Sequence, residues 1–292
     1  MTGSNLIRIA VLLACYNRRE KTLIFLESLT NQPAFKKLKI DIYLLDDGST
    51  DGTDTAVNIQ YPDVIILKGD GNLWWVGAMV KLWNYAIDQK TYDLFLLVND
   101  DIILFDNSLE KFISNYTQLN KSGVILIGST KDFKSDKWTY GGHLLDNMKR
   151  FKFSPIPPHD HQFIPCHLGH ANFFLVDAAT VKKIGIFSDA YDHKFADYDY
   201  TLTAHKAGLD VLIAPGYYAW CENDHGYNWL SGNHPLKERI SYLSKPNGLA
   251  YREFIHFTKN HFRLVYPGAI IKPWLKTFFP IFWDRFKRAA DK

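Results

Sequence analysis

Residues 92–101 read YDLFLLVNDD, a run of apolar and β-branched residues that ends in an amide and two adjacent carboxylates. The apolar part predicts a buried β-strand, and the polar part predicts a turn at its carboxyl end. Two carboxylates beside a buried strand are costly unless a cation meets them, and their oxygens suit a hard divalent ion such as Mg²⁺ or Mn²⁺. Asn and Asp are also ordinary turn residues, so this segment alone leaves both interpretations open.

A second predicted strand ends in the same way. Residues 40–45 read IDIYLL and are followed by DDGSTDGT at residues 46–53, an acidic turn that leads into a helix. An apolar strand at residues 7–14 leads into CYNRR and another helix, and a short strand at residues 64–67 precedes a helix at residues 77–89. Strands that alternate with helices predict a mainly parallel α/β sheet, with the loops that follow the strands on one edge.

Short motifs along the chain have a recognisable order and spacing. They are ACYNR at 14–18, LDDGSTDGT at 45–53, NDD at 99–101, GG at 141–142, GHA at 169–171, GIF at 185–187 and FADYD at 195–199. Together they resemble the inverting glycosyltransferases of family 2 and, among these, the rhamnosyltransferase-like branch. The resemblance covers residues 6–230 and implies the GT-A fold, a Rossmann-like, mainly parallel sheet flanked by helices.

Two positions depart from the family pattern. The chain has Ala196 where the family often has Glu before the Asp, and Thr203 where the family often has Arg. The second departure leaves open how the helix after the acidic motif is braced. The adjacent pair Trp74 and Trp75 is unusual for the family and marks a candidate contact for a particular sugar or acceptor.

The resemblance implies a role for each carboxylate of the NDD segment at residues 99–101. Asp101 would hold Mn²⁺ or Mg²⁺ beside the diphosphate of the donor, while Asp100 would bind the ribose or share the metal ion. Some relatives use a histidine after the last strand as a further metal or diphosphate contact, and His225 follows the last predicted strand here. A histidine in an ordinary polar loop is the alternative interpretation of His225.

Nucleotide recognition is expected in the first two loops. The resemblance assigns the N3–H of a uracil or thymine base to Asp47, because a carboxylate accepts such a hydrogen bond. Tyr16 is placed to pack on the base, Ala14 leaves the backbone open to it, and Arg18 is placed to approach the phosphates. Ordinary surface positions are the alternative for Tyr16 and Arg18.

The acceptor hydroxyl needs a base, and the acidic motif at residues 195–199 supplies two carboxylates. By its position in the resemblance, Asp197 is the predicted base, with Asp199 as the runner-up. If Asp197 opens a helix, the two side chains point in different directions, so they cannot face the acceptor equally. The alternative is that both carboxylates only stabilise a helix N-terminus.

The second half of the chain is less regular. Residues 138–145 predict a hairpin or edge strand, and the proline-rich residues 151–165 predict a loop. Contacts to the sugar or the acceptor are assigned to the tryptophan pair and to the small-residue loop, namely Trp74, Trp75, Gly169, His170 and Ala171.

Composition supports a globular enzyme without identifying it. The 292 residues carry a net charge of +3, which is too small to indicate a nucleic-acid partner. Three cysteines far apart in the sequence favour reduced thiols. The first residues show no signal-peptide pattern, and no apolar stretch is long enough to span a membrane. We therefore expect a cytoplasmic protein.

The chain is expected to have two regions. They are a catalytic domain at residues 1–235, with a nucleotide-binding half at 1–125 and an acceptor-binding half at 126–235, and a C-terminal helical region at 236–292. From residue 270 onward, aromatic, apolar and basic residues are interleaved, which is typical of a helix that lies on a membrane surface, and Pro280 would kink or divide it. Packing against the catalytic domain, or against a second copy in a homo-oligomer, is the alternative.

These features predict a metal-dependent inverting glycosyltransferase. It would move a sugar from a nucleoside-diphosphate sugar, with dTDP-rhamnose or a UDP-sugar favoured, to a glycan or lipid-linked acceptor in cell-surface polysaccharide synthesis. One alternative is a nucleotidyltransferase with a similar sheet, whose Gly-, Arg- and Lys-rich phosphate loop is not found at residues 15–20. The other is a non-catalytic nucleotide-sugar-binding protein, against which the intact Asp101 and Asp197 argue.

Overall fold

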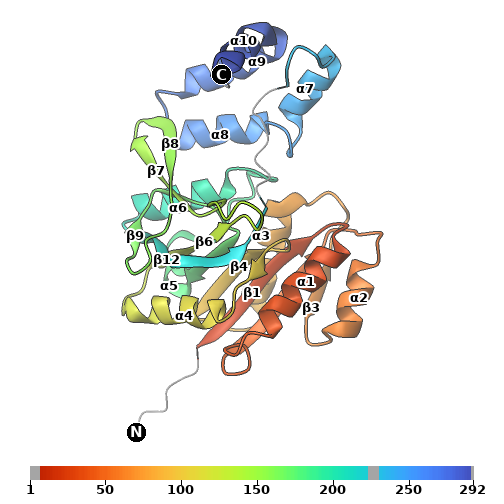
Figure 1. Cartoon of the computed structure of the whole chain (residues 1–292), viewed down its shortest axis with the longest axis vertical. Helices are drawn as coiled ribbons and strands as arrows, with labels where there is room; N and C mark the ends of the chain where they lie inside the picture. Colours follow the sequence, from red (N-terminus) through yellow and green to blue (C-terminus); the bar gives the residue numbers. More distant parts are fainter. Residues whose placement is uncertain (1–6, 223–229, 291–292) are drawn as a thin grey trace.

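A mixed α/β sheet forms the centre of the molecule (Figure 1). The computed structural model describes residues 7–222 and 230–290. The strands of the main sheet are β1 (Arg8–Cys15), β2 (Lys39–Asp46), β3 (Ile65–Lys68), β4 (Leu94–Asn99), β5 (Ile103–Leu104), β6 (Val124–Lys131), β9 (Ile164–Pro165), β11 (Phe173–Asp177) and β12 (Asp210–Trp220). Within the described residues their order is β3-β2-β1-β4-β11-β6-β12-β5, with β9 paired to β12.

The first half of this sheet is parallel, as the alternation of strands and helices predicts. β1 pairs in parallel with β2 and β4, and β2 pairs in parallel with β3. The register sets Ala14 opposite Asn99 on one side of β1 and Cys15 opposite Asp46 on the other. The loops that follow β1, β2 and β4 therefore begin side by side at one edge of the sheet.

β11 departs from the parallel pattern, because it runs antiparallel to both β4 and β6. Its register sets Phe173 opposite Val98, and the Asn99 N–H donates to the carbonyl oxygen of Asn172 at 3.1 Å. The amino end of a strand lies at the same edge of the sheet as the carboxyl ends of the neighbours to which it runs antiparallel. The residues just before β11 consequently lie beside the carboxylates that follow β4.

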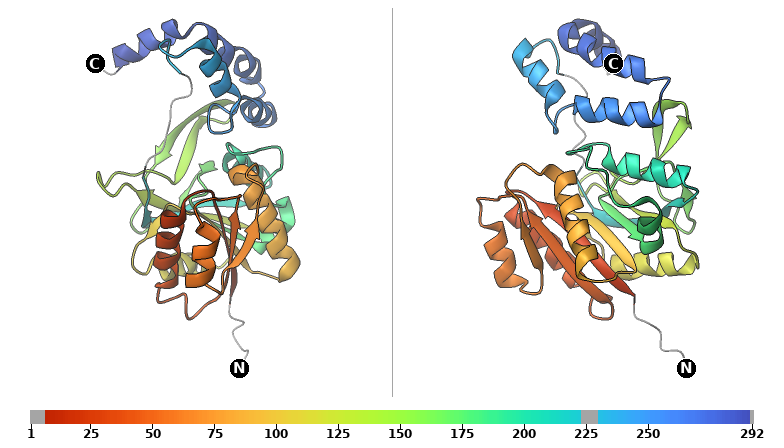
Figure 2. Two further views of the ribbon diagram at one scale, coloured as in Figure 1. Left: turned by 90° about the vertical axis from the view of Figure 1, so that its right-hand side faces the viewer. Right: turned by 180° about the vertical axis from the view of Figure 1, so that it is seen from behind.

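Helices cover both faces of the main sheet (Figures 1 and 2). One face carries α1 (Arg19–Thr30), α2 (Thr53–Gln60) and α4 (Ser108–Gln118), and the other carries α3 (Trp74–Gln89), α5 (Ala178–Ile184) and α6 (Ala196–Lys206). Successive side chains of β1 point to opposite faces, so Val11 is buried with the first group and Leu12 with the second. Two apolar layers therefore hold the sheet and fix its carboxyl edge.

A second, three-stranded sheet is formed by β7 (Gly142–Asn147), β8 (Arg150–Ile156) and β10 (Leu168–Gly169). The expectation of a loop throughout residues 151–165 is wrong for residues 151–156, which pair antiparallel with β7. Within β8, Phe151 and Phe153 are partly buried and their neighbours Lys152 and Ser154 are exposed. This alternation is the period-two signal of a strand, and the prolines that follow obscure it in the sequence.

Four helices follow, namely α7 (Leu236–Ser244), α8 (Tyr251–His261), α9 (Tyr266–Phe278) and α10 (Pro280–Ala290). Figure 1 shows them beyond the β7–β8 hairpin, at the end of the molecule away from the N-terminus. α8 packs on this hairpin: the ring of Phe151 lies 5.1 Å from that of Phe257 and 5.3 Å from that of Phe262, between ring centroids. Pro280 begins α10 directly after α9 ends, so the expected division at this proline is confirmed. In the described part of the chain, no helix combines the length and the apolar character needed to cross a membrane.

Candidate active site

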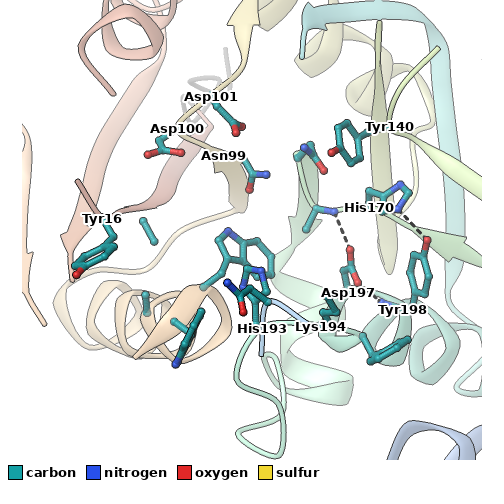
Figure 3. A pocket seen from close by; sticks show the side chains of 18 of the residues that line it. Tyr16, Asn99, Asp100, Asp101, Tyr140, His170, His193, Lys194, Asp197 and Tyr198 are labelled. Carbon is teal, nitrogen blue, oxygen red and sulfur yellow. Dashed lines mark hydrogen bonds between the residues drawn. The ribbon is translucent and has the colours of Figure 1, made fainter. Parts of the chain in front are cut away.

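A cavity of about 1000 Å³ opens at the edge of the sheet where β1, β2 and β4 end (Figure 3). Most of the residues singled out in the sequence line it, namely Ala14, Tyr16, Arg18, Asp47, Trp74, Trp75, Asp100, Asp101, His170, Ala171 and Asp197. Gly169 and Asp199 are not part of its lining, and His225 lies outside the described residues. Gly169 instead serves packing, because a Cβ there would collide with the side chain of Ile127.

A guanidinium group bridges the two carboxylates that follow β4. Arg18 Nη1 lies 3.0 Å from Asp100 Oδ1 and 2.8 Å from Asp101 Oδ2. Asp100 is almost fully buried, and this burial raises its pKa to about 6; the charge of Arg18 lowers the pKa and the charge of Asp101 raises it. One cation thus offsets two carboxylates, and its own side chain remains 42% exposed.

Two buried side-chain oxygens at the end of β4 make no hydrogen bond within the described residues. They are Asn99 Oδ1 and Asp101 Oδ1. Buried acceptors without a protein donor meet an ordered water, a ligand or a cation, and oxygen ligands fit Mn²⁺ or Mg²⁺. Residues 7–222 and 230–290 contain no group of three or more His, Cys, Asp or Glu that could hold a metal ion. Oxygens of a bound ligand would therefore have to complete the coordination.

Asp47 is held by the N-terminus of α3. Its carboxylate accepts hydrogen bonds from the N–H groups of Gly71 at 3.0 Å, Leu73 at 3.0 Å and Trp74 at 3.2 Å. The backbone of Gly69 lies so close to the Asp47 carboxylate that a Cβ at Gly69 would collide with Asp47 Oδ1. A carboxylate has about four acceptor positions, so about one remains for a ligand.

Asp197 is the second residue of α6 and faces the cavity, with no cationic partner in the part of the chain that the structure describes (Figure 3). Its carboxylate accepts hydrogen bonds from the N–H of Tyr198 at 2.8 Å and from the N–H of Ala171 at 3.4 Å. Burial raises the pKa of Asp197 to about 6, and these backbone hydrogen bonds lower it only in part. The result is a carboxylate that is more basic than an exposed one and that points into the cavity.

Asp199 points elsewhere and is already occupied. It accepts a hydrogen bond from the Tyr191 hydroxyl at 2.8 Å, and it lies 2.7 Å from Nε2 of His261, at the end of α8. These contacts join α6 to the C-terminal helices. Of the two acidic residues in the motif, the geometry favours Asp197 for contact with a ligand.

Aromatic side chains from the second half of the chain form much of the remaining wall. The Tyr198 hydroxyl lies 2.8 Å from His170 Nε2, and the ring of His170 lies 5.2 Å from that of Tyr140, between centroids. Sequence analysis missed several lining residues, namely Trp138, Tyr140, His143, Phe153, His193, Lys194 and Tyr198. Lys194 and Tyr198 lie within or next to the acidic motif, which could have marked them; Phe153 lies in the segment mistaken for a loop.

The loop that carries His193 and Lys194 forms hydrogen bonds with a residue outside the main sheet. Glu253 of α8 accepts hydrogen bonds from the N–H of His193 at 3.2 Å and from the N–H of Lys194 at 2.7 Å. Burial lowers the pKa of His193 to about 4, so its ring is neutral near pH 7. The cavity therefore depends on the C-terminal helices for part of its wall.

Residues 10–179, more than half of the chain, match the protein family described as Glycosyl transferase family 2. The chain belongs to this family. No curated protein sequence matches this family 2 chain. The match to the family covers β1 to β11 and thus contains the carboxylate pair, but it ends before Asp197.

Solved structures share the fold of this family 2 protein at low sequence identity. GalNAc-T7, solved with UDP, GalNAc and Mn²⁺, has a TM-score of 0.61 at 11% identity, over 94% of this chain and 58% of its own. The mannosyltransferase PcManGT from Pyrobaculum calidifontis, solved with GDP-Man and Mn²⁺, has a TM-score of 0.55 at 14% identity, over 93% and 70%. TarS of S. aureus has a TM-score of 0.55 at 14% identity, over 87% and 43%. The GT-A fold expected from the sequence is confirmed, and the chain spans less than two thirds of the length of the first of these proteins.

Replacing Asp197 by Asn is expected to stabilise the protein above pH 6. Because burial raises the folded-state pKa of Asp197 to about 6 from an ordinary 3.8, the folded protein holds this proton more tightly than the unfolded chain does. The native carboxylate therefore lowers the free energy of unfolding as the pH rises from about 4 to about 6, by about 1–3 kcal/mol in total. Urea unfolding should show a gap between variant and wild type at pH 8 that closes at pH 4.

Asp199→Asn is the matched control for this experiment. It should lose about 1–3 kcal/mol of stability at pH 8, because Tyr191 and His261 lose their charged acceptor. An Asp197→Asn variant that is less stable than wild type at pH 8 would show that Asp197 only stabilises the helix N-terminus.

Proposed function

We propose that this protein is a metal-dependent, inverting glycosyltransferase that uses a nucleoside-diphosphate sugar. The observation that carries the proposal is the presence of two kinds of carboxylate in one cavity (Figure 3). Asp100 and Asp101 contact Arg18, whereas none of the described residues places a cation beside Asp197. Glycosyl transfer needs this division, because charge develops on the leaving group while a base is needed at the nucleophile.

The donor is proposed to bind in the loops after β1, β2 and β4. Asp101, with Asp100 beside it, would hold Mn²⁺ or Mg²⁺, which when bound neutralises charge on the departing diphosphate. Arg18 is partly exposed and is placed to bind a phosphate oxygen as well as the carboxylates. The ring of Tyr16 is 54% exposed and offers a surface for the base, while Asp47 has about one acceptor position left for it.

The acceptor is proposed to bind near Asp197. Asp197 takes the proton of the acceptor hydroxyl while the new C–O bond forms on the face of the sugar opposite the breaking bond to the diphosphate, so the anomeric carbon is inverted. With a pKa of about 6, this carboxylate is deprotonated at neutral pH and more basic than an exposed one. Trp74, Trp75, His170 and Ala171 line the same cavity and are the proposed contacts of the sugar and acceptor.

For the donor we propose a thymidine or uridine diphosphate sugar. The motifs at residues 141–142, 169–171, 185–187 and 195–199 resemble those of the rhamnosyltransferase-like branch, which puts dTDP-rhamnose first. The complexes of GalNAc-T7 with UDP and of PcManGT with GDP-Man support a nucleotide sugar as the class of donor. The acceptor is proposed to be a glycan or a lipid-linked sugar in cell-surface polysaccharide synthesis.

The two alternative functions account for less of the cavity. A nucleotidyltransferase would contact phosphates through the loop after β1, where residues 15–20 contain no glycine. A protein that only binds nucleotide sugars would have no use for a buried Asp197 that lacks a cationic partner among the described residues, because such a group costs stability.

The boundary at residue 235 between a catalytic domain and a C-terminal helical region is likewise a proposal. Glu253, which lies after this boundary, holds the loop of His193 and Lys194 in the cavity wall.

The C-terminal helices suggest where the protein acts. Exposed apolar side chains of α9, of α10 and of the residue between them include Ile271, Leu275, Phe278, Phe279, Ile281 and Phe282. The basic residues among them are Lys272, Lys276 and Arg285, and we name this set the apolar–basic face. Apolar side chains interleaved with cations fit an anionic lipid surface. We propose that this face binds the cytoplasmic side of a membrane, with contact between copies in a homo-oligomer as the alternative.

Asp101→Asn is expected to abolish transfer and to remove the metal dependence of nucleotide binding. Without the Asp101 carboxylate, the proposed site loses its principal ligand, while Arg18 and Asp100 remain paired. Titration calorimetry with UDP and with dTDP at increasing Mn²⁺ measures the effect. Asp106→Asn, an exposed residue in the turn before α4, is the control with the same change of charge and should behave like wild type. Undiminished metal dependence in the Asp101 variant would refute the assignment.

Asp197→Asn is expected to lower kcat by about 10²–10⁴-fold while donor affinity stays within about twofold. In the wild type, kcat should rise with pH through about 6, because the base acts only when deprotonated, and this limb should be absent from the variant. The measurement is turnover of nucleotide sugars in a panel, compared with donor binding. Asp199→Asn, assayed where it remains folded, should keep most of its kcat; the reverse ranking would make Asp199 the base.

Ile281→Ser combined with Phe282→Ser is expected to release the protein from vesicles that contain phosphatidylglycerol at low salt. The two side chains are 72% and 64% exposed, so folding should not depend on them. Ile59→Ser combined with Phe133→Ser removes equally exposed apolar groups from elsewhere, 73% and 71%, and should leave vesicle binding unchanged. Equal flotation of both variants with vesicles would reject the membrane proposal, and a change of oligomeric state would favour contact between copies.

A further inference from the structure

A smaller cavity of about 430 Å³ adjoins the large one. Its lining comes from α7 and from the turn after it, mainly Lys237, Glu238, Ser241, Tyr242, Lys245 and Asn247. Asn247 lines the large cavity as well, so the two cavities meet at this side chain. Nothing in the proposed transfer of a sugar between donor and acceptor hydroxyl uses the smaller space.

The wall between the two cavities is a tight turn at residues 245–248. The Gly248 N–H donates to the carbonyl oxygen of Lys245 at 2.9 Å, and a Cβ at Gly248 would collide with the carbonyl oxygen of Tyr242. Lys194, which lines the large cavity, donates from Nζ to the carbonyl oxygen of Gly248. The turn is therefore fixed both to the end of α7 and to the loop that precedes Asp197.

Two lysines give the smaller cavity a positive character. The side chains of Lys237 and Lys245 are exposed, and neither forms an ion pair with any residue in 7–222 or 230–290. The acid in the same wall, Glu238, lies 3.2 Å from His234 Nδ1. Ammonium groups without a carboxylate partner are suited to phosphate oxygens.

α7 and the turn before it are joined to the two helices of the apolar–basic face. Arg239 Nη1 donates to the carbonyl oxygen of Thr277 in α9 at 2.7 Å. Gly232, in the turn before α7, donates its N–H to Asp284 Oδ2 in α10 at 2.8 Å. Figure 2 shows α7, α9 and α10 together at one end of the molecule. The smaller cavity thus meets the large one at Asn247, and the helix that lines it contacts a helix of the apolar–basic face.

We propose that the smaller cavity binds the phosphate or diphosphate of a lipid-linked sugar acceptor. This inference rests on the proposed function and gives the acceptor a chemical class. The acceptor has a sugar, an anionic link and an apolar chain, one each for the large cavity, the smaller cavity and the apolar–basic face. Its sugar enters the large cavity past Asn247 toward Asp197, its phosphates lie between Lys237 and Lys245, and its chain leaves over the apolar–basic face.

The test measures binding of farnesyl diphosphate, a soluble diphosphate with an apolar chain, to the full-length chain. Saturating UDP and Mn²⁺ are present so that the probe does not occupy the donor site. Lys237→Ala combined with Lys245→Ala is expected to weaken binding by about tenfold or more, because two charged contacts to the diphosphate are lost. Lys182→Ala combined with Lys183→Ala, two exposed lysines of α5, removes the same charge and should change binding by less than twofold.

Each other outcome has a defined meaning. Equal affinity of the Lys237/Lys245 variant and wild type, or equal loss in the Lys182/Lys183 variant, would overturn the proposal. If inorganic pyrophosphate binds as tightly as farnesyl diphosphate, the cavity is a site for free phosphate and the proposal fails. If phosphatidylglycerol vesicles compete with farnesyl diphosphate, the cavity is a general lipid site and the proposal fails as well. If UDP with Mn²⁺ binds wild type but farnesyl diphosphate does not, only this inference fails; if no nucleotide binds, the proposed function fails first.

Discussion

The cavity of this protein depends on the direction of one strand. β11 runs antiparallel between β4 and β6, so its amino end lies at the edge where β1, β2 and β4 present their carboxyl ends. The Asn99 N–H, just before the carboxylate pair, donates to the carbonyl oxygen of Asn172, just before β11. Ala171, one residue earlier, donates in turn to Asp197. A parallel β11 would place these residues at the opposite edge and would separate Asp197 from the carboxylate pair.

The carboxylates at the two ends of the cavity have different partners. The pair formed by Asp100 and Asp101 shares Arg18, which lowers the pKa of Asp100 against the effect of burial. Among the described residues, Asp197 has only backbone N–H groups as hydrogen-bond partners. Burial is the largest influence on both groups and raises the pKa of Asp100 and the pKa of Asp197 to about 6. Buried carboxylates without a cation cost stability, and such costs concentrate at functional sites. The same cavity therefore holds two acids that share a cation and one acid that has no cationic partner among the described residues.

The C-terminal helices are part of the same construction. Glu253 of α8 holds the loop before α6 through two N–H groups, and His261 at the end of α8 contacts Asp199. Phe195, directly before α6, has a positive φ of 65° and packs on Phe257 of α8 with 5.2 Å between ring centroids. Since left-handed backbone is unfavourable for a residue with a bulky side chain, this packing helps to hold the start of α6. The position of Asp197 thus depends on helices that lie beyond the family match.

Local patterns predicted the elements and the edge of the sheet at which the carboxylate pair lies. Apolar strands that alternate with capped helices predicted β1 to β4 and their helices, because burial and capping act within about ten residues. The acidic ends of β2 and β4 fall at one edge whatever the rest of the chain does, since parallel strands share a direction. For the same reason the sequence placed Asp100, Asp101 and Arg18 in one candidate site.

Only the tertiary structure decided the other half of the cavity. Strand direction is not encoded in the apolar pattern of β11, and the pairing of residues 150–156 with β7 is hidden by nearby prolines. Other features of the cavity depend on hydrogen bonds between separate elements or loops. Asp199 is turned away from the cavity by Tyr191, Asp47 accepts from the N-terminus of α3, and Glu253 accepts from Lys194. Such contacts depend on how whole elements pack, and packing is a property of the folded chain that no local segment carries.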